Sequence, residues 1–101
     1  MSRTVVVRYE TRTDAAEDNQ RLVEEVFAQL NRDDPGGLRY MTLRLADGVS
    51  FVHVAVIEGE NDPLSESPAF SEFQKGIRDR VVGPPEPASA TLIGSYRFLA
   101  G

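Results

Sequence analysis

The feature that most constrains this chain is the order of its hydrophobic patterns, in which helical spacing twice interrupts strand-like segments. Residues 4–10 (TVVVRYE) are β-branched and aromatic, and their alternation predicts a strand. Apolar residues then recur at helical spacing up to Leu30, which predicts an amphipathic helix. We expect this helix to begin at an Asp14 N-cap, with Glu17 completing a capping box, and to end at the breaker cluster 33–37.

The rest of the chain predicts three more strands and one more helix. We expect them in the order strand 38–45, strand 49–58, a helix that opens at residue 67, and strand 89–99. The pair Asp47 and Gly48 between two apolar runs is typical of a hairpin turn. Ser67 followed by Pro68 predicts the N-cap and the first residue of the second helix.

This order, β-α-β-β-α-β, is that of the split βαβ motif. With right-handed crossovers it gives a four-stranded antiparallel sheet with both helices on one face, which is a ferredoxin-like α+β fold. A chain of 101 residues accommodates one such unit. We therefore assign residues 1–101 to a single domain.

The helices can cover only one face of that sheet, yet the predicted strand 49–58 is apolar on both faces. Phe51 and Ile57 point one way, whereas Val52 and Val54 point the other. An apolar sheet face of this kind is buried when two copies pack face to face, so the pattern favours a homodimer through the sheet faces. The alternative is a monomer in which arginine and serine side chains keep the second face hydrated.

Composition and charge exclude several classes of function. The formal net charge is −5 and the pI is about 4.8, which argues against nucleic-acid binding. The absence of cysteine excludes disulfides and thiolate sites, and with a single histidine we expect no metal. The apolar runs are too short to span a membrane and the N-terminus lacks a signal-peptide core, so we expect a cytoplasmic protein without membrane contact. The strong bias of arginine over lysine favours a bacterial source.

Three segments carry a resemblance to a known family: 51–54 (FVHV), 67–73 (SPAFSEF) and 94–98 (GSYRF). Together with the βαββαβ order, they resemble the dimeric α/β-barrel superfamily, and particularly its antibiotic-biosynthesis-monooxygenase-like branch. The resemblance implies a dimer whose sheets form a barrel, and a small-molecule cleft between sheet and helices. Such proteins include cofactor-independent oxygenases, haem-degrading enzymes, small isomerases and proteins with no known activity, so the fold does not settle the function.

His53, the only histidine, is the candidate catalytic residue, as a general base or hydrogen-bond donor in the cleft. The alternative is a hydrogen-bonded histidine at the sheet surface or the dimer interface. Asn19, near the apolar stripe of the first helix, and the strand residues Tyr9 and Tyr96 are candidate ligand-binding residues. Tyr40 is the remaining strand tyrosine. Each tyrosine can instead serve core packing, and Asn19 can be exposed.

Two functions follow from the resemblance. The first is a cofactor-independent, monooxygenase-like enzyme that acts on a small apolar or aromatic metabolite positioned by His53 and a tyrosine. The second is a non-catalytic dimeric module that binds a small molecule or acts as an accessory unit, with side chains filling the space between sheet and helices. The chain has no tryptophan, which such oxygenases often use, and its predicted helices lack the histidine of haem-degrading members. No cofactor is expected for either function.

Overall fold

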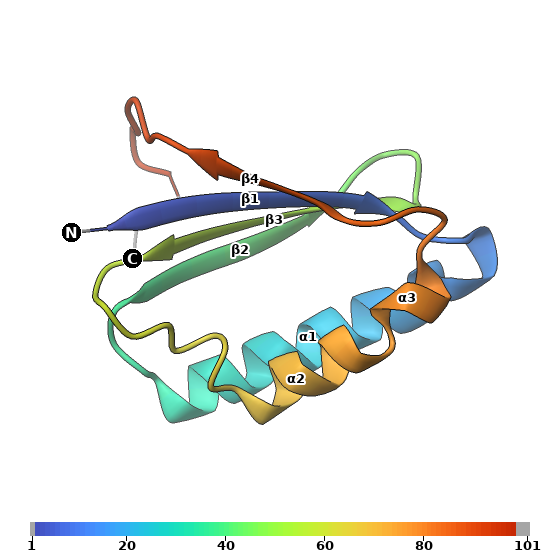
Figure 1. The fold of residues 1–101 in the computed structure, drawn as a ribbon, viewed down its shortest axis with the longest axis horizontal. Coiled ribbons are helices and arrows are strands. Elements are labelled where there is room, and N and C mark those ends of the chain that lie inside the picture. Colours follow the sequence, from blue (N-terminus) through green and yellow to red (C-terminus); the bar gives the residue numbers. More distant parts are fainter. Residues whose placement is uncertain (1, 99–101) are drawn as a thin grey trace.

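The computed structural model describes residues 2–98 and has the predicted β-α-β-β-α-β order (Figure 1). The strands are β1 (Arg3–Glu10), β2 (Leu38–Arg44), β3 (Ser50–Ile57) and β4 (Glu86–Ala90). The helical elements are a 3₁₀ turn η1 (Thr13–Ala15), α1 (Ala16–Asp33), α2 (Pro68–Lys75) and α3 (Ile77–Arg80). All strands pair antiparallel in the order β2-β3-β1-β4, and the helices cover one face of the sheet. The predicted ferredoxin-like fold is confirmed.

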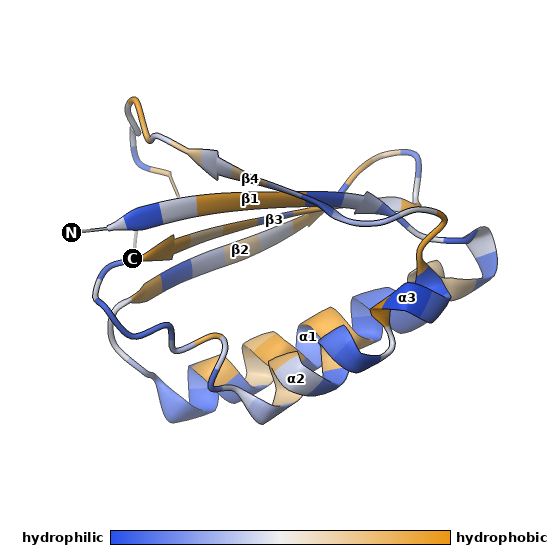
Figure 2. Cartoon of the chain, in the orientation of Figure 1, coloured by the Kyte–Doolittle hydropathy of each residue, from blue (hydrophilic) through white to orange (hydrophobic). Residues whose placement is uncertain are grey.

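The central strands β1 and β3 place alternate side chains on the two faces of the sheet. The register sets Val7 of β1 and Thr42 of β2 on either side of His53. On the helix side, these strands contribute to a core that also takes residues from α1, α2 and the connection before α2. The buried members of this core are Tyr9, Val23, Val26, Phe51, Ala55, Leu64 and Phe73. Figure 2 shows this apolar character along the central strands and in patches on α1.

The hairpin between β2 and β3 forms at the predicted Asp47-Gly48 turn. Gly48 has φ 82°, a left-handed conformation that glycine adopts without steric cost. The Asp47 carboxylate accepts hydrogen bonds from the Ser50 hydroxyl and from the Val49 and Ser50 amides, at 2.6, 2.9 and 2.8 Å. These bonds favour the ionised form and hold the pKa of Asp47 below its usual value. The turn therefore fixes the register that brings β2 side chains beside His53.

The start of α1 differs from the predicted capping box. Asp14 lies in the 3₁₀ turn η1, and α1 begins at Ala16 without a side-chain cap hydrogen bond. The buried Ala15 packs at the entry to the helix, while Glu17 pairs with Arg44 of β2 at 2.8 Å. The tight turn from β1 and the ion pair to β2 thus replace the predicted cap.

The second helix begins as predicted and then breaks. The Ser67 hydroxyl accepts from the Phe70 amide at 3.2 Å, with Pro68 in the first helical turn. The helix stops at Gly76, and α3 adds one further short turn. Within residues 2–98, no helix combines the length and the apolar character that a bilayer-spanning segment needs.

The predicted fourth strand, 89–99, is wrong in its position. β4 starts and ends earlier and contains Pro87, which is tolerated because β4 is an edge strand paired only with β1. The last pair of the β1–β4 ladder joins Thr4 to Ala90. Residues 91–98 therefore run past the start of β1 and pair with no strand of the described structure. Leu99, the last residue of the predicted strand, lies outside the described residues.

Apolar side chains on the sheet side that the helices leave free are half-buried on the central strands and exposed in the segment after β4. Val6 of β1 lies opposite Val54 of β3, and Met41 of β2 lies opposite Val54 on its other side. After β4, Ile93 is 99% exposed and Tyr96 is 81% exposed. Leu92 and Phe98 are exposed as well. A single chain thus covers one face of its sheet and leaves the other open.

The link between α1 and α2 gives a first testable prediction. The Ser67 hydroxyl caps α2 and also donates to Gln29 Oε1 of α1 at 2.9 Å. Ser67→Ala removes both bonds, so we expect the free energy of unfolding to fall by about 1–2 kcal/mol in urea denaturation. Ser71→Ala on the exposed side of α2 is the control, and an equal loss in both variants would contradict this account.

Candidate functional site

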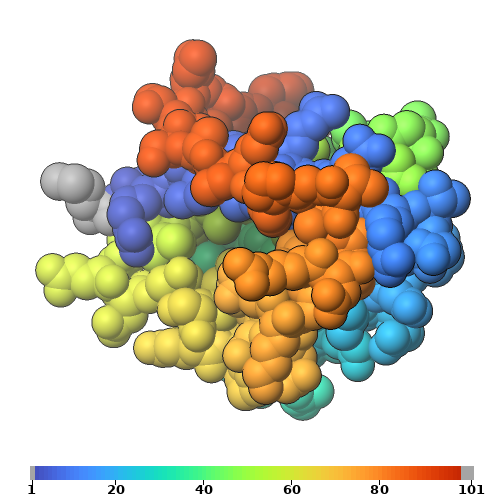
Figure 3. Space-filling model, turned by 45° about the vertical axis from the view of Figure 1, so that its right-hand side comes forward, coloured from blue at the N-terminus to red at the C-terminus, as the bar shows by residue number. Residues whose placement is uncertain are grey.

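A cavity of about 650 Å³ lies between the sheet and the α2–α3 segment. Its walls are mostly apolar, and they come from alternate residues of β1 and β3 and from the helical segment. The apolar lining includes Val5, Val7, Ala55, Ile57, Leu64, Phe70, Phe73 and Ile77. Figure 3 shows the mouth as a hollow between the β1–β4 edge and the segment that runs from the end of β3 into α2. The size fits a small-molecule site, and the space is open rather than filled with side chains.

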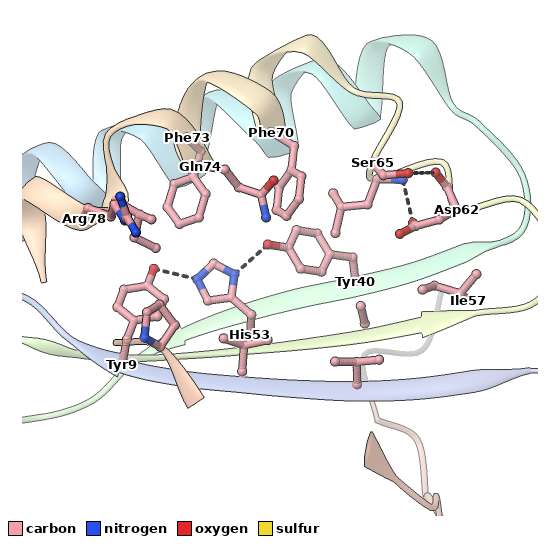
Figure 4. A pocket seen from close by; sticks show the side chains of 16 residues that line it. Tyr9, Tyr40, His53, Ile57, Asp62, Ser65, Phe70, Phe73, Gln74 and Arg78 are labelled. Carbon is pink, nitrogen blue, oxygen red and sulfur yellow. Dashed lines mark hydrogen bonds between the residues drawn. The ribbon is translucent and has the colours of Figure 1, made fainter. Parts of the chain in front are cut away.

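His53 lies at the sheet side of this cavity and is hydrogen-bonded through both ring nitrogens (Figure 4). Its Nε2 is 2.7 Å from the Tyr9 hydroxyl, and its Nδ1 is 2.6 Å from the Tyr40 hydroxyl. Thr42 Oγ1 is 3.1 Å from the same Nδ1. Phe73 of α2 covers the imidazole, with ring centroids 5.5 Å apart. The histidine is therefore held by aromatic groups from two neighbouring strands and one helix.

The sheet register explains why two tyrosines reach one imidazole. Val7 and Thr42 lie directly opposite His53 on its two sides. Tyr9 is two residues beyond Val7, and Tyr40 is two residues before Thr42, so both share the helix-side face with His53. Each is a diagonal neighbour of the histidine, within reach of a long aromatic side chain. The two hydroxyls consequently approach the ring from opposite ends.

Behind Tyr9, Asn19 and Arg80 extend the polar network away from the cavity. Asn19 is 0% exposed, and its Nδ2 donates to the Tyr9 hydroxyl at 2.9 Å. Its Oδ1 accepts from Arg80 Nε, also at 2.9 Å. Arg80 is 8% exposed, lies over the Phe73 ring and donates through Nη2 to the Phe73 carbonyl at 2.7 Å. A Cβ on Gly76 would come within 2.8 Å of Arg80 Nη1, so this glycine leaves room for the guanidinium.

The structure brings together three of the four residues singled out from the sequence. His53 and Tyr9 line the cavity. Asn19 supports Tyr9 from behind and is itself buried, in place of the exposed position that the sequence left open. Tyr96 does not join them, because it lies exposed in the chain after β4. The cavity lining in residues 2–98 does not include it.

Sequence reasoning did not select three further members of the network. Tyr40 was one tyrosine among several, and Thr42 and Arg80 were not considered. A signal for Arg80 exists, because it follows Phe73 by seven residues and Ile77 by three, which places it on the same helical face. For Thr42 and Tyr40 the signal is the hairpin register, which pairs Thr42 with His53.

Burial keeps the polar groups of the cavity floor uncharged at neutral pH. It lowers the pKa of His53 to about 4, because the charged imidazolium is poorly solvated there. It raises the pKa of Tyr40 to about 12, and it raises the pKa of Tyr9 even further. Within residues 2–98 there is no group of three or more histidine, aspartate or glutamate side chains suited to hold a metal ion. The floor is therefore a neutral set of hydrogen-bonding groups beside apolar walls.

Known structures place this fold among the antibiotic biosynthesis monooxygenase proteins. A Nitrosomonas europaea protein whose name assigns it to that class matches with TM-score 0.75 and 19% identity, over 91% of this chain and 90% of its own. A Bacteroides thetaiotaomicron protein with the same assignment matches with TM-score 0.78 and 18% identity, over the same shares of the two chains. A point mutant of SnoaB, a cofactor-independent oxygenase from Streptomyces nogalater, matches with TM-score 0.67 and 20% identity, over 93% and 95%.

These likenesses establish the fold. The chain has the ferredoxin-like architecture of the antibiotic biosynthesis monooxygenase branch, as the sequence resemblance implied. No protein-family model matches the sequence, and no curated protein matches it either. The identities of the structural neighbours are too low to carry a substrate or a reaction over to this chain.

The depressed pKa of His53 gives a prediction for stability against pH. The folded pKa is about 4 and the unfolded value is 6.5, so the unfolded chain binds more protons between these two pH values. Stability from this group is complete above pH 6.5 and is lost as pH falls through that window, by on the order of 3 kcal/mol.

The measurement compares wild type with His53→Gln, an uncharged variant, in urea denaturation at neutral and at acidic pH. We expect the wild type to lose more stability than the variant as the pH falls, because only the wild type must keep an uncharged imidazole. Since both proteins carry the same carboxyl groups, the difference between them isolates the histidine. Equal losses would show that His53 titrates normally.

Proposed function

We propose that this protein is a cofactor-independent, monooxygenase-like enzyme that acts on a small apolar or aromatic molecule bound in the cavity. The observation that carries the proposal is the cavity itself, whose apolar walls close over a floor of neutral Tyr9, His53 and Tyr40. A flat aromatic body suits the walls, and a polar substituent suits the floor. The fold likeness to a cofactor-independent oxygenase supports the same class of reaction.

Such a reaction needs no bound cofactor when the substrate supplies the electrons. In the oxidation of an activated ring CH₂ to a carbonyl, one atom of O₂ enters the product and the other leaves as water, together with the two hydrogens of the CH₂ group. The step begins from the substrate anion, which forms when the activated CH₂ loses a proton to solvent before the ring is enclosed. The protein's part is then to bind the ring and stabilise negative charge on oxygen. The Tyr40 hydroxyl lies where it can donate to that oxygen. His53 acts as the positioning residue that holds it.

The proposal predicts oxygen consumption without added metal or cofactor. Anthrone is a suitable probe because its activated ring CH₂ is the group that this step oxidises and its enolate carries the negative oxygen. We expect the purified chain to accelerate oxygen uptake by anthrone, and Tyr40→Phe to reduce that acceleration by at least about tenfold through loss of a hydroxyl donor.

Tyr96→Phe is the matched control, because Tyr96 does not line the cavity and its hydroxyl should not matter. Oxygen uptake at the rate of the protein-free solution would contradict the proposal. So would an activity that chelators abolish.

The second candidate is a non-catalytic module that binds the same class of molecule. It is favoured by one observation: both nitrogens of His53 are already engaged by protein hydroxyls, which leaves no free general base on the floor. Under this alternative anthrone binds in the cavity, and oxygen uptake does not rise above the uncatalysed rate. The oxygen measurement combined with a binding titration separates the two candidates.

We also propose that two copies pair through the uncovered sheet faces. Val6, Met41 and Val54 form an apolar row across β1, β2 and β3, and the helices lie on the opposite side. The segment after β4 lies on the side of the sheet away from the helices (Figure 1) and carries further exposed apolar residues. A second copy supplies an identical apolar face, so two-fold pairing buries both at once. The arrangement corresponds to the barrel-type dimer that the sequence resemblance implies.

A charge placed in the centre of that row tests the dimer. Val54→Glu puts a carboxylate between Val6 and Met41 on the outer face, away from the cavity. We expect a dimer for wild type and a monomer for this variant in sedimentation velocity, because the new charge would be buried without a partner. Ala28→Glu adds the same charge on the exposed side of α1 and should stay dimeric. A monomeric wild type would refute the pairing.

A further inference from the structure

The orientation of the Asn19 amide is fixed by its neighbour Arg80. A guanidinium has only donors, so the Asn19 atom 2.9 Å from Arg80 Nε must be the amide oxygen. The amide nitrogen therefore faces Tyr9, at 2.9 Å from its hydroxyl oxygen. It follows that the Tyr9 oxygen accepts a hydrogen bond from Asn19.

This acceptance decides where the Tyr9 hydroxyl hydrogen lies. With its oxygen accepting from Asn19, Tyr9 can donate to His53 Nε2 at 2.7 Å, and this is the one further hydrogen-bond partner of its hydroxyl in residues 2–98. Nε2 is then the bare nitrogen of a neutral imidazole, and Nδ1 carries the proton. The Nδ1 hydrogen points at Tyr40 at 2.6 Å and at Thr42 at 3.1 Å.

The opposite arrangement leaves a buried hydrogen without a partner. With the proton on Nε2, the Tyr9 oxygen would accept from both Asn19 and His53, and its own hydrogen would have no acceptor in the described network. Tyr9 is 5% exposed, so this unpaired hydrogen would carry the full cost of desolvation. Tyr40 is the less buried tyrosine and lines the cavity, where a ligand or water can take its hydrogen.

We infer that a hydrogen-bond chain runs in one direction, from Arg80 through Asn19, Tyr9 and His53 to Tyr40. The chain ends in the Tyr40 hydroxyl hydrogen, which is offered to an oxygen acceptor in the cavity. The inference deepens the proposed function, because it concerns the same cavity and names the ligand class: an aromatic molecule with a carbonyl or phenolate oxygen. Every donor in the chain points from the buried cation toward the ligand.

The cation at the head of the chain strengthens its final donor. Arg80 is buried, and among residues 2–98 no carboxylate lies within ion-pair distance of it. Asp18 and Asp79 interact with its charge from further away and offset part of it. The remaining field acts along the aligned hydrogen bonds, which polarise one another in the low-dielectric interior. The Tyr40 hydroxyl becomes a better donor than an isolated tyrosine, and an oxygen with negative charge gains most from it. A ligand that offers only donors or hydrocarbon edges gains nothing at this point.

The single histidine makes the direction of the chain measurable without any ligand. In nitrogen-labelled protein, a long-range proton–nitrogen correlation spectrum contains one imidazole and reports which nitrogen is protonated. We expect the Nδ1-protonated tautomer in wild type. Tyr40→Phe should keep it, because Tyr9 still donates to Nε2 and Thr42 still accepts from Nδ1.

Tyr9→Phe is the matched variant with the opposite expectation. It removes the donor that keeps Nε2 unprotonated, so the strict preference for an Nδ1 proton should be lost and the Nε2-protonated tautomer should appear in the spectrum. Both variants delete one hydroxyl next to the same ring, and a merely structural role would move the two spectra alike. An Nε2 proton in wild type would overturn the inference.

Ligand recognition is tested with two probes of similar shape, naphthoquinone and naphthalene. Tyr40→Phe should weaken naphthoquinone binding about tenfold, as expected for the loss of one polarised hydrogen bond, and should leave naphthalene binding unchanged. The infrared carbonyl stretch of bound naphthoquinone should lie at lower frequency in wild type than in the variant. Equal affinities and equal frequencies would refute Tyr40 as the donor.

The two proposals can fail separately. An Nδ1 proton together with Tyr40-dependent quinone binding, but no oxygen uptake, would retain the hydrogen-bond chain and remove the oxygenase. Oxygen uptake with an Nε2 proton would retain the enzyme and remove the chain.

Discussion

A largely buried imidazole on a central strand of the sheet is the constraint around which this molecule is arranged. His53 is 6% exposed, and each of its nitrogens must find a partner inside the protein or lose the hydrogen bond that water would have given it. Strands on both sides supply those partners through Tyr9 and Tyr40. The buried Tyr9 hydroxyl oxygen in turn accepts a hydrogen bond from Asn19, and the buried Asn19 amide oxygen accepts one from Arg80. One buried ring thus links the sheet to α1 and α3.

The same constraint shapes the cavity. The aromatic groups that hold His53 stand upright on the sheet, and Phe73 covers the imidazole from α2. Beyond them the lining changes to smaller side chains such as Val5, Val7 and Ala55, which leave the space open. The hydrogen-bonding groups therefore lie at one end of an otherwise apolar cavity. In a bound ligand, the polar end of the cavity would fix the orientation, and contacts with the apolar walls would supply most of the affinity.

The order and type of most elements could be predicted from local pattern. The amphipathic stripe of α1, the Asp47-Gly48 turn and the Ser67 cap all act over a few residues, and the structure contains all three. The predicted capping box at Asp14 is the local feature that it does not contain. The fourth strand was misplaced because its composition fits a strand while its pairing depends on where β1 begins. A segment with high β-propensity forms a strand only where another strand is available to pair with it.

The site was predictable to a smaller extent. His53 and Tyr9 were selected because polar groups in apolar strands are rare enough to notice. Asn19 was selected because it is a polar residue near the apolar stripe of a helix, but its hydrogen-bond partners could not be predicted from the sequence. Its bond to Arg80 joins residues far apart in the sequence through tertiary packing alone. The register beside His53 was accessible in principle, since a two-residue turn at Asp47-Gly48 pairs Thr42 with His53 by counting outward from the turn.

The break between α2 and α3 limits which stabilising mutations this protein can accept without disturbing its site. Gly76 has φ −100°, a conformation open to any residue, and alanine there would normally raise stability by restricting the unfolded chain. Its missing side chain, however, is the space that the Arg80 guanidinium occupies. Mutations selected for stability alone would therefore favour a residue that displaces the arginine and loosens its bond to Asn19. At this position the chain accepts a weaker helix in exchange for an ordered site, a trade-off between stability and function.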